Sequence, residues 1–278
     1  MNILDLFSGI GGMSLGFEAA NYDDYDFNKM PDKQNAKSDN FFKTIAFCEI
    51  DKNCHKVLNA HFPNVPIFDD VTKLKASDLK DSVDIITGGF PCQDLSVAGR
   101  KAGLDSERSG LFSEILRLAD ETNAKYILFE NSEQLICKKQ YYRVFAKRLG
   151  DYGYRFEAFL FSASDFGYPH TRKRAYVIAY NNEIKRISLA DGQTFQNLIN
   201  IKIQFDRRSS RNVERICSCR HRRKATRDFS TERDFLLGNN GFSEAMVKFG
   251  MLGNSLIPAI PHAFAEVIKK MESKNERD

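Results

Sequence analysis

The chain has 278 residues, 42% of them hydrophobic and 28% charged, a composition typical of a soluble folded protein and not of a disordered or fibrous one. The longest unbroken apolar run, residues 175–180, is far shorter than the roughly 20 residues of a membrane span, and the first residues carry no basic leader. The absence of a long apolar run and of a basic leader predicts a cytoplasmic protein with no membrane association, and the net charge is only +4. The six cysteines are scattered along the chain, which predicts reduced thiols rather than disulfides.

Seven short apolar segments alternate with helix-like segments. The expected strands are residues 2–7, 44–49, 67–71, 83–87, 126–130, 157–162 and 175–180, and the expected helices are residues 12–20, 51–61, 110–122 and 140–149. Continuously apolar strands that alternate with helices predict a mostly parallel α/β sheet. Functional residues are therefore expected just after the strands, at the carboxyl edge of that sheet.

The first expected strand runs into a glycine-rich turn, Asp5-Leu-Phe-Ser-Gly-Ile-Gly-Gly12, and then into a helix. Such a turn lets a nucleotide-like ligand approach the backbone and the helix N-terminus closely. A tight strand-to-helix connection without a ligand is the alternative. Glu49 and Asp70 end the second and third segments, so Glu49 is a candidate for ribose binding or for capping the helix that follows.

The fourth segment leads into Gly88-Gly-Phe-Pro-Cys-Gln-Asp-Leu-Ser96, which places Cys92 on a loop at the carboxyl end of a central strand. A thiolate is a strong nucleophile, and this location favours catalysis over the usual structural role of a buried cysteine. Cys48, Cys54 and Cys137 lie within or beside apolar patterns and are expected to be core or surface thiols.

Charged residues also mark the ends of the fifth and seventh segments. Glu130 ends the fifth and is a candidate general acid or a structural ion-pair partner. Arg172 and Arg174 lead into the seventh at a spacing that puts both on one strand face, where they could hold a phosphate or a carbonyl oxygen.

Three stretches depart from the alternation. Residues 21–40 are a polar insertion, residues 181–240 a small basic module, and residues 241–278 a segment that returns to the main domain, residues 1–180. Nine Lys/Arg and one acid occupy residues 207–227, which suits a solvated loop, a disordered arm or a phosphate-contacting surface. Cys217 and Cys219 lack the usual zinc-ligand spacing, so no metal is expected.

These motifs together resemble the cytosine-5 DNA methyltransferases. The resemblance is carried by DLFSGIGG, the acids Glu49 and Asp70, GGFPCQ, Glu130-Asn131, the two arginines Arg172 and Arg174, and Gly253-Asn-Ser255, in the family's order and approximate spacing. It covers residues 1–180 and resumes near residue 249. It implies a Rossmann-like, mostly parallel seven-stranded sheet with a short target-recognition region.

The resemblance further implies S-adenosylmethionine as the methyl donor. Its expected binding residues are Phe7, Ser8, Gly9, Ile10, Gly11, Gly12, Glu49, Ile50, Asp70, Val71, Pro91, Leu111, Asn254 and Ser255. Cys92 would attack carbon 6 of a cytosine turned out of the duplex, Glu130 would protonate ring nitrogen 3, and Arg172 and Arg174 would hold the base. Methyl transfer to carbon 5, loss of the carbon 5 proton and β-elimination would then release 5-methylcytosine.

Double-stranded DNA is the implied partner, with a cognate restriction endonuclease that is not a stable subunit and a monomeric enzyme. The expected DNA-binding residues are Gln93, Ser96, Arg207, Arg208, Arg211, Arg215, Arg220, Arg222 and Arg223. The chain departs from the family pattern at Ser132, at His170 and in its short recognition region, where residues 227–236 are the nearest counterpart of the usual motif. A transfer-RNA methyltransferase, an idle DNA-binding homologue and a nicotinamide oxidoreductase are the alternatives.

Overall fold

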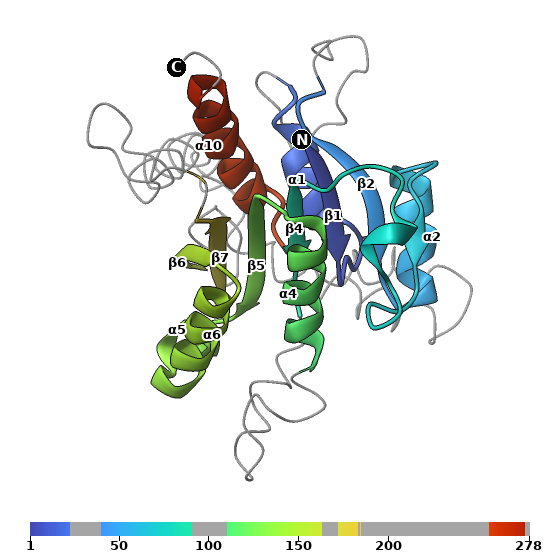
Figure 1. Cartoon of the computed structure of the whole chain (residues 1–278). Helices are drawn as coiled ribbons and strands as arrows, with labels where there is room; N and C mark the ends of the chain where they lie inside the picture. The colour runs from blue at the N-terminus through green and yellow to red at the C-terminus, as the bar shows by residue number, and fades with distance from the viewer. Residues whose placement is uncertain (23–39, 91–109, 163–171, 183, 185–255, 276–278) are drawn as a thin grey trace, which may run out of the picture.

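The computed structural model of the chain describes residues 1–22, 40–90, 110–162, 172–182, 184 and 256–275. Strands and helices alternate along it as predicted (Figure 1). The strands are β1 (Asn2–Leu6), β2 (Lys43–Cys48), β3 (Ile67–Phe68), β4 (Ile85–Gly88), β5 (Tyr126–Ser132), β6 (Tyr154–Ser162) and β7 (Lys173–Asn181). The helices are α1 (Gly12–Ala19), α2 (Lys52–His61), the short 3-10 helix η2 (Ala76–Asp78), α4 (Gly110–Thr122), α5 (Gln134–Cys137), α6 (Lys139–Asp151) and α10 (Ala259–Asn275).

The strands form one seven-stranded sheet in the order β3-β2-β1-β4-β5-β7-β6, so the predicted α/β fold is confirmed. The five strands from β3 to β5 pair in parallel, whereas β7 pairs antiparallel with both β5 and β6. The carboxyl ends of the parallel strands therefore meet at one edge, and β7 enters the sheet from that same edge. This carboxyl edge is where a doubly wound sheet binds its ligands.

Helices cover both faces of the sheet, because side chains of alternate residues along each strand point to opposite faces. In β5, Ile127 and Phe129 belong to a core formed with α4 and α6, on the near side of the sheet in Figure 1. Tyr126 and Leu128 belong to a second core formed with α1 and α10. Glu130 continues this second face and thus reaches the carboxyl edge on the side of α1 and α10.

The two edge strands differ from their predicted lengths. β3 has only two residues, so Asp70 and Val71 lie in the turn after it. β6 begins at Tyr154, three residues earlier than predicted, because it pairs with β7 along its whole length. The predicted insertion at residues 21–40 and the basic module at residues 181–240 fall almost entirely outside the described residues, so the proposed domain boundaries stay predictions.

Within the described residues, no helix combines the length and the apolar character that crossing a membrane requires.

Candidate active site

The turn between β1 and α1 exposes its backbone at the carboxyl edge. Phe7, Gly9 and Gly11 all have positive φ, at 53°, 54° and 84°. A Cβ on Gly11 would lie 2.9 Å from side-chain atoms of α2 and of the residue after it, so only glycine fits there, whereas Gly9 faces open space. The turn therefore leaves bare backbone, unshielded by a side chain at Gly9, in the position expected for the cofactor.

Glu49 follows β2 and links this turn to the start of α2. One carboxylate oxygen accepts the backbone N–H of Gly9 at 2.7 Å, and the other accepts the N–H of Asp51 at 2.9 Å. Each oxygen keeps a second lone pair that could accept a hydroxyl group. The next residue, Ile50, is an apolar side chain with 79% of its surface exposed. The structure thus puts a positioned carboxylate and an uncovered apolar side chain beside the glycine turn.

Asp70 opens the turn after β3. Its Oδ1 accepts the backbone N–H of Thr72 at 3.0 Å and the Thr72 hydroxyl at 2.7 Å. The hydrogen bonds from Thr72, together with nearby Lys73, lower the pKa of the Asp70 carboxyl, so it is ionised at neutral pH. Val71 is buried in the core formed with α4, and the partly buried Leu111 packs against the same core.

Asp5 is a buried acid whose role the motif analysis did not identify. It is 1% exposed within β1 and accepts hydrogen bonds from the Ser14 hydroxyl at 2.8 Å and the Thr87 hydroxyl at 2.7 Å. Burial raises its pKa to about 7, although the two hydroxyl groups act in the opposite direction. Asp5 thereby joins the first turn of α1 to β4, the strand that precedes the Cys92 loop. The sequence does offer one sign of such a role, because Asp5 is an acid within a strand that is otherwise mostly apolar.

Glu130 and Arg174 form a largely buried ion pair at the carboxyl edge. Arg174 Nε lies 2.9 Å from Glu130 Oε1. The pairing register explains the contact: Glu130 lies opposite Tyr176, so Arg174, two residues earlier on β7, is its diagonal neighbour on the same face. Burial raises the pKa of Glu130, and the positive charges of Arg174 and then Arg172 limit the rise. The carboxyl group is therefore both oriented and biased toward its protonated form.

The described end of β4 places the approach to Cys92 directly against Glu130. Gly88 pairs with Phe129, and a Cβ on Gly89 would lie 3.2 Å from Glu130 Oε2. The side-chain amide of Asn131 donates a hydrogen bond to the carbonyl oxygen of Phe90 at 3.0 Å. The backbone that enters the Cys92 loop is thus fixed to β5 at Gly88 and at Phe90.

The remaining predicted site residues lie outside the described residues. They are Pro91, Cys92, Gln93, Ser96, Asn254, Ser255, Arg207, Arg208, Arg211, Arg215, Arg220, Arg222 and Arg223. The three cysteines predicted to be structural do lie in the described part. Burial raises the pKa of Cys48 to about 12 and that of Cys54 to about 11, whereas Cys137 is exposed. The two buried thiols are poorly suited to nucleophilic catalysis at neutral pH.

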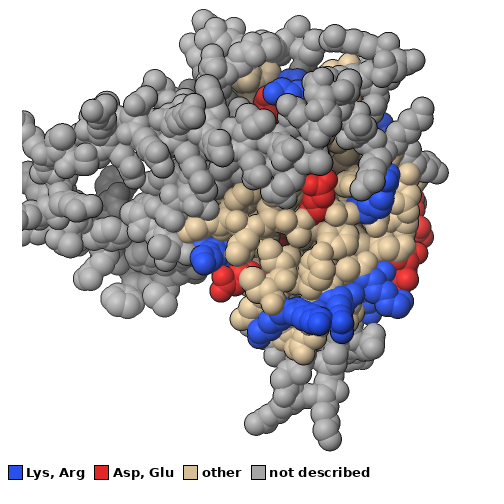
Figure 2. Space-filling view, turned by 90° about the vertical axis from the view of Figure 1, so that its left-hand side faces the viewer, with Lys and Arg blue, Asp and Glu red and all other residues tan. Residues whose placement is uncertain are grey.

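A cationic surface adjoins the Glu130–Arg174 pair. A hollow of about 410 Å³ is lined by Ser132, Glu133, Gln134, Arg172, Lys173 and Arg174. Lys138, between α5 and α6, and Lys139 and Arg143, on α6, are exposed. Figure 2 shows Lys and Arg side chains gathered in a band on the side of the molecule that it faces. The field of such a surface attracts anionic ligands to this side of the carboxyl edge.

Comparison with known proteins gives consistent matches. A profile of the family described as C-5 cytosine-specific DNA methylase matches residues 1–233. The chain is 35% identical over 196 residues to the Type II methyltransferase M1.ScrFI of Lactococcus lactis subsp. cremoris, an alignment that covers 70% of this chain and 44% of the relative. It is 31% identical over 218 residues to the Type II methyltransferase M.Bsp6I of Bacillus sp. (strain RFL6), covering 75% of this chain and 63% of the relative.

The chain thus spans about half the length of the curated relatives that it matches. Among solved structures, it is similar to a DNA modification methyltransferase encoded within a prophage of E. coli. The TM-score is 0.51 with 26% identity, over 69% of this chain and 49% of that chain.

Proposed function

The chain belongs to the C-5 cytosine-specific DNA methylase family, and on this premise we propose that it is a DNA (cytosine-5-)-methyltransferase acting on double-stranded DNA. The observation that carries the proposal is the Glu130–Arg174 pair, buried at the carboxyl edge beside the strand that leads to Cys92. The matches to Type II methyltransferases support a role in a restriction-modification system.

Glu130 is the proposed proton donor to ring nitrogen 3 of the cytosine. A general acid has to hold a proton near neutral pH, and burial raises the pKa of Glu130 in that direction. Arg174 binds Oε1 of Glu130. The other oxygen, Oε2, lies beside Gly89, three residues before Cys92. Arg172 adds positive charge beside the acid, and we assign to it and to Arg174 the binding of the cytosine oxygen.

Cys92 is the proposed nucleophile. Its thiolate would form a bond to carbon 6 of the pyrimidine, which pushes electron density onto carbon 5 while nitrogen 3 takes the proton of Glu130. After carbon 5 is methylated, water or another base would take the carbon 5 proton as the carbon–sulfur bond breaks. Nitrogen 3 would return its proton to Glu130, so the thiolate, the acid and the aromatic ring are all regenerated. Neither buried cysteine of the described part is a candidate for this step, because burial raises the pKa of both thiols.

The residues around the β1–α1 turn fit S-adenosylmethionine. When bound, this cofactor supplies an electrophilic methyl group on a positively charged sulfonium. Gly9 leaves room for a ligand against the backbone, and Glu49 is held by two backbone N–H groups with lone pairs left for ribose hydroxyls. Exposed Ile50 offers an apolar face for the base, and ionised Asp70 lies at the next strand end as a hydrogen-bond acceptor.

Duplex DNA is the proposed substrate. A cytosine must leave the base stack before a thiol can attack its ring, which costs a few kcal/mol. Cationic side chains near the site can offset part of that cost by binding the DNA phosphates. Lys138, Lys139 and Arg143, exposed on the segment that follows β5, offer such charges in addition to the basic segment at residues 207–227. The cognate endonuclease, the monomeric state and the cytoplasmic location stay predictions from the sequence.

The deciding experiment traps the enzyme on a DNA duplex that contains 5-fluorocytosine, in the presence of S-adenosylmethionine. Fluorine at carbon 5 cannot leave as a proton does, so the enzyme is expected to remain covalently attached through Cys92. Cys92→Ser should abolish both the adduct and methylation but retain cofactor binding. Cys137→Ser, which changes an exposed thiol, is the matched control and should behave as the wild type.

An adduct formed equally by the Cys92→Ser variant would contradict the proposed mechanism. The same assay with transfer RNA in place of duplex DNA tests the RNA alternative, and direct binding of NAD tests the oxidoreductase alternative. Bisulfite sequencing of DNA from cells that express the chain then identifies the target sequence.

A further inference from the structure

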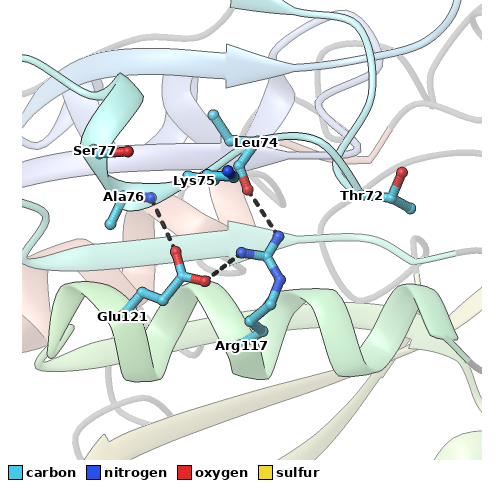
Figure 3. Close-up of a pocket in the computed structure, with 7 residues that line it drawn as sticks. All are labelled: Thr72, Leu74, Lys75, Ala76, Ser77, Arg117 and Glu121. Atoms are coloured by element: carbon cyan, nitrogen blue, oxygen red, sulfur yellow. Dashed lines mark hydrogen bonds and ion pairs between the residues drawn. The ribbon is translucent and has the colours of Figure 1, made fainter.

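Arg117, on α4, makes contacts that an ordinary helix-surface arginine does not make. Its Nη2 donates one hydrogen bond to the carbonyl oxygen of Val71 at 3.1 Å. It donates a second to the carbonyl oxygen of Leu74 at 2.8 Å, which Figure 3 shows. Both acceptors belong to the turn after β3, which is more than 40 positions away in the sequence. The guanidinium group therefore ties a helix to a non-helical segment.

Two acids on α4 hold the guanidinium group in place. Glu114 accepts a hydrogen bond from Arg117 Nε at 2.8 Å, and Glu121 accepts one from Nη1 at 2.6 Å. Glu121 also accepts the backbone N–H of Ala76 at 3.0 Å, so it contacts the same turn directly. We call Glu114, Arg117 and Glu121 the α4 clamp. An exposed i,i+4 ion pair alone contributes little, but a planar fork that binds two carbonyls and two carboxylates fixes a geometry.

The segment bound by the α4 clamp has few other backbone anchors. β3 contributes only two residues to the sheet, so sheet pairing fixes little of the chain between Phe68 and β4. The turn begins at Asp70, whose carbonyl oxygen accepts the N–H groups of Lys73 and Leu74. Val71 and Leu74 are buried in the core beneath. The α4 clamp therefore supplies the polar contacts that set the position of the Asp70 turn against α4.

Both sides of this connection carry residues proposed to bind the cofactor. Asp70 and Val71 lie on the turn, and Leu111 lies on α4 about 9 Å along the helix axis from Arg117, at 1.5 Å per residue. We propose that Arg117 is a positioning residue that fixes Asp70 and Val71 relative to Leu111 and so sets the affinity for S-adenosylmethionine. This inference rests on the proposed function.

The hollow next to Arg117 is not itself proposed as a ligand site. It measures about 510 Å³ and is lined by Thr72, Leu74, Lys75, Ala76, Ser77, Arg117 and Glu121. Arg117 and Glu121 are already bonded to each other and to backbone groups, as the hydrogen bonds above show. The α4 clamp acts through the turn and not through a ligand of its own.

The test compares Arg117→Gln and Arg117→Lys with the wild-type chain. For Arg117→Gln, the Kd for S-adenosylmethionine, measured by calorimetry, should rise about tenfold. A change of this size is expected when one charge-assisted hydrogen bond is lost. The KM for the cofactor should rise in parallel, while kcat at saturating cofactor and the KM for DNA stay within about twofold. Arg117→Lys should recover part of the affinity, because an ammonium group can reach one carbonyl but cannot span two.

Lys147→Gln is the matched control. It breaks an i,i+4 ion pair of the same 2.6 Å length, between Lys147 and Asp151 on α6, a helix that carries no residue proposed to bind the cofactor. Hydrogen exchange provides a readout that needs no cofactor: the amides of residues 71–76 should exchange faster in Arg117→Gln than in Lys147→Gln.

An unchanged cofactor Kd in Arg117→Gln, or unchanged exchange in residues 71–76, would overturn the role of the α4 clamp while leaving the proposed function intact. If Arg117→Gln does not fold, Arg117→Lys decides by the same two measurements. A wild-type chain that binds no S-adenosylmethionine would instead overturn the proposed function, and the role of Arg117 with it.

Discussion

Gly89 gives a direct test of how closely the position of Glu130 controls the chemistry. In Gly89→Ala, the added Cβ would meet Glu130 Oε2 at 3.2 Å, so the carboxyl group must shift by a few tenths of an ångström. Because the contact is with the end of a side chain, stability should change by less than about 1 kcal/mol. The methylation rate at saturating substrates should nevertheless fall about tenfold, since an acid works only within hydrogen-bonding reach of the atom that it protonates.

Gly150→Ala is the control for this variant, because a Cβ at Gly150 would meet no atom within 4 Å. Wild-type kcat in Gly89→Ala, with a normal melting temperature, would show that Glu130 tolerates the displacement and would weaken its assignment as proton donor.

Asp5 should make stability depend on pH in a defined direction. Its carboxyl group has a pKa of about 7 in the folded chain against 3.8 as the ordinary value, chiefly because it is buried. Between these values the folded state binds more protons than the unfolded state, so the free energy of unfolding falls as pH rises. The slope from this group is at most about 1.4 kcal/mol per pH unit.

Asp5→Asn removes this titration and keeps a side chain that can accept from one hydroxyl group and donate to the other. The difference in unfolding free energy between the wild type and Asp5→Asn, measured by urea denaturation, should shift in favour of the variant from about pH 4 to pH 7. A difference that stays constant over this range would show that Asp5 does not titrate there.

The sequence could locate Glu49, Glu130 and Arg174 because each lies next to an apolar strand, and strand ends are local features of a sequence. It could not reveal what Asp5 and Arg117 contact, because those contacts bridge 82 and 46 positions along the chain. The catalytic roles of the located residues remain predictions until the variants are measured.

At the scale of elements, the packing of α10 on α1 depends on the absence of a side chain at Gly16. A Cβ there would lie 2.5 Å from both the carbonyl oxygen of Pro258 and the ring of Pro261. These atoms are backbone and a rigid ring, so α10 would have to move. Gly16→Ala should therefore lower the free energy of unfolding by about 1–3 kcal/mol, measured by chemical denaturation.

The contrast with Gly150→Ala separates this clash from the general effect of placing alanine in a helix. Gly150 lies in α6 with open space around it, so that variant should be neutral or more stable by about 0.4–1 kcal/mol. Equal stabilities for the two variants would mean that α10 does not pack on α1 as closely as the structure has it.

Element boundaries were predictable where the apolar pattern was strong. The helix at residues 110–122 was predicted to the residue, and every predicted strand is present. Strand ends differ from the prediction by up to two residues inside the sheet, and by three residues at one end of β3 and of β6, its two edges. An apolar segment shows its tendency to form a strand but not how many neighbours it will have, so strand length at an edge is set by pairing that the sequence does not display.

At the scale of the whole molecule, positive charge is concentrated in one segment. Residues 207–227 hold nine Lys/Arg and one acid, while the chain as a whole has a net charge of only +4. The fold of the described part follows from local patterns, but the target sequence does not, because it depends on contacts between this segment and particular bases.

The basic segment should account for much of the salt dependence of DNA binding. Each phosphate contact adds about 0.9 to the slope of log K against log salt concentration. Changing Arg207, Arg208, Arg211 and Arg215 together to Gln should reduce the slope by up to about 3.6, less if some of the arginines point to solvent. Fluorescence anisotropy with a DNA duplex at several salt concentrations measures it.

Four exposed lysines toward the opposite edge of the sheet give a control of equal charge: Lys43, Lys80, Lys125 and Lys270. Lys43 begins β2 and Lys125 directly precedes β5, so both lie at the amino ends of parallel strands, away from the proposed site. Changing all four to Gln removes the same net charge but no proposed phosphate contact. If both quadruple variants flatten the slope equally, the effect is that of net charge alone and the basic segment is not a DNA contact.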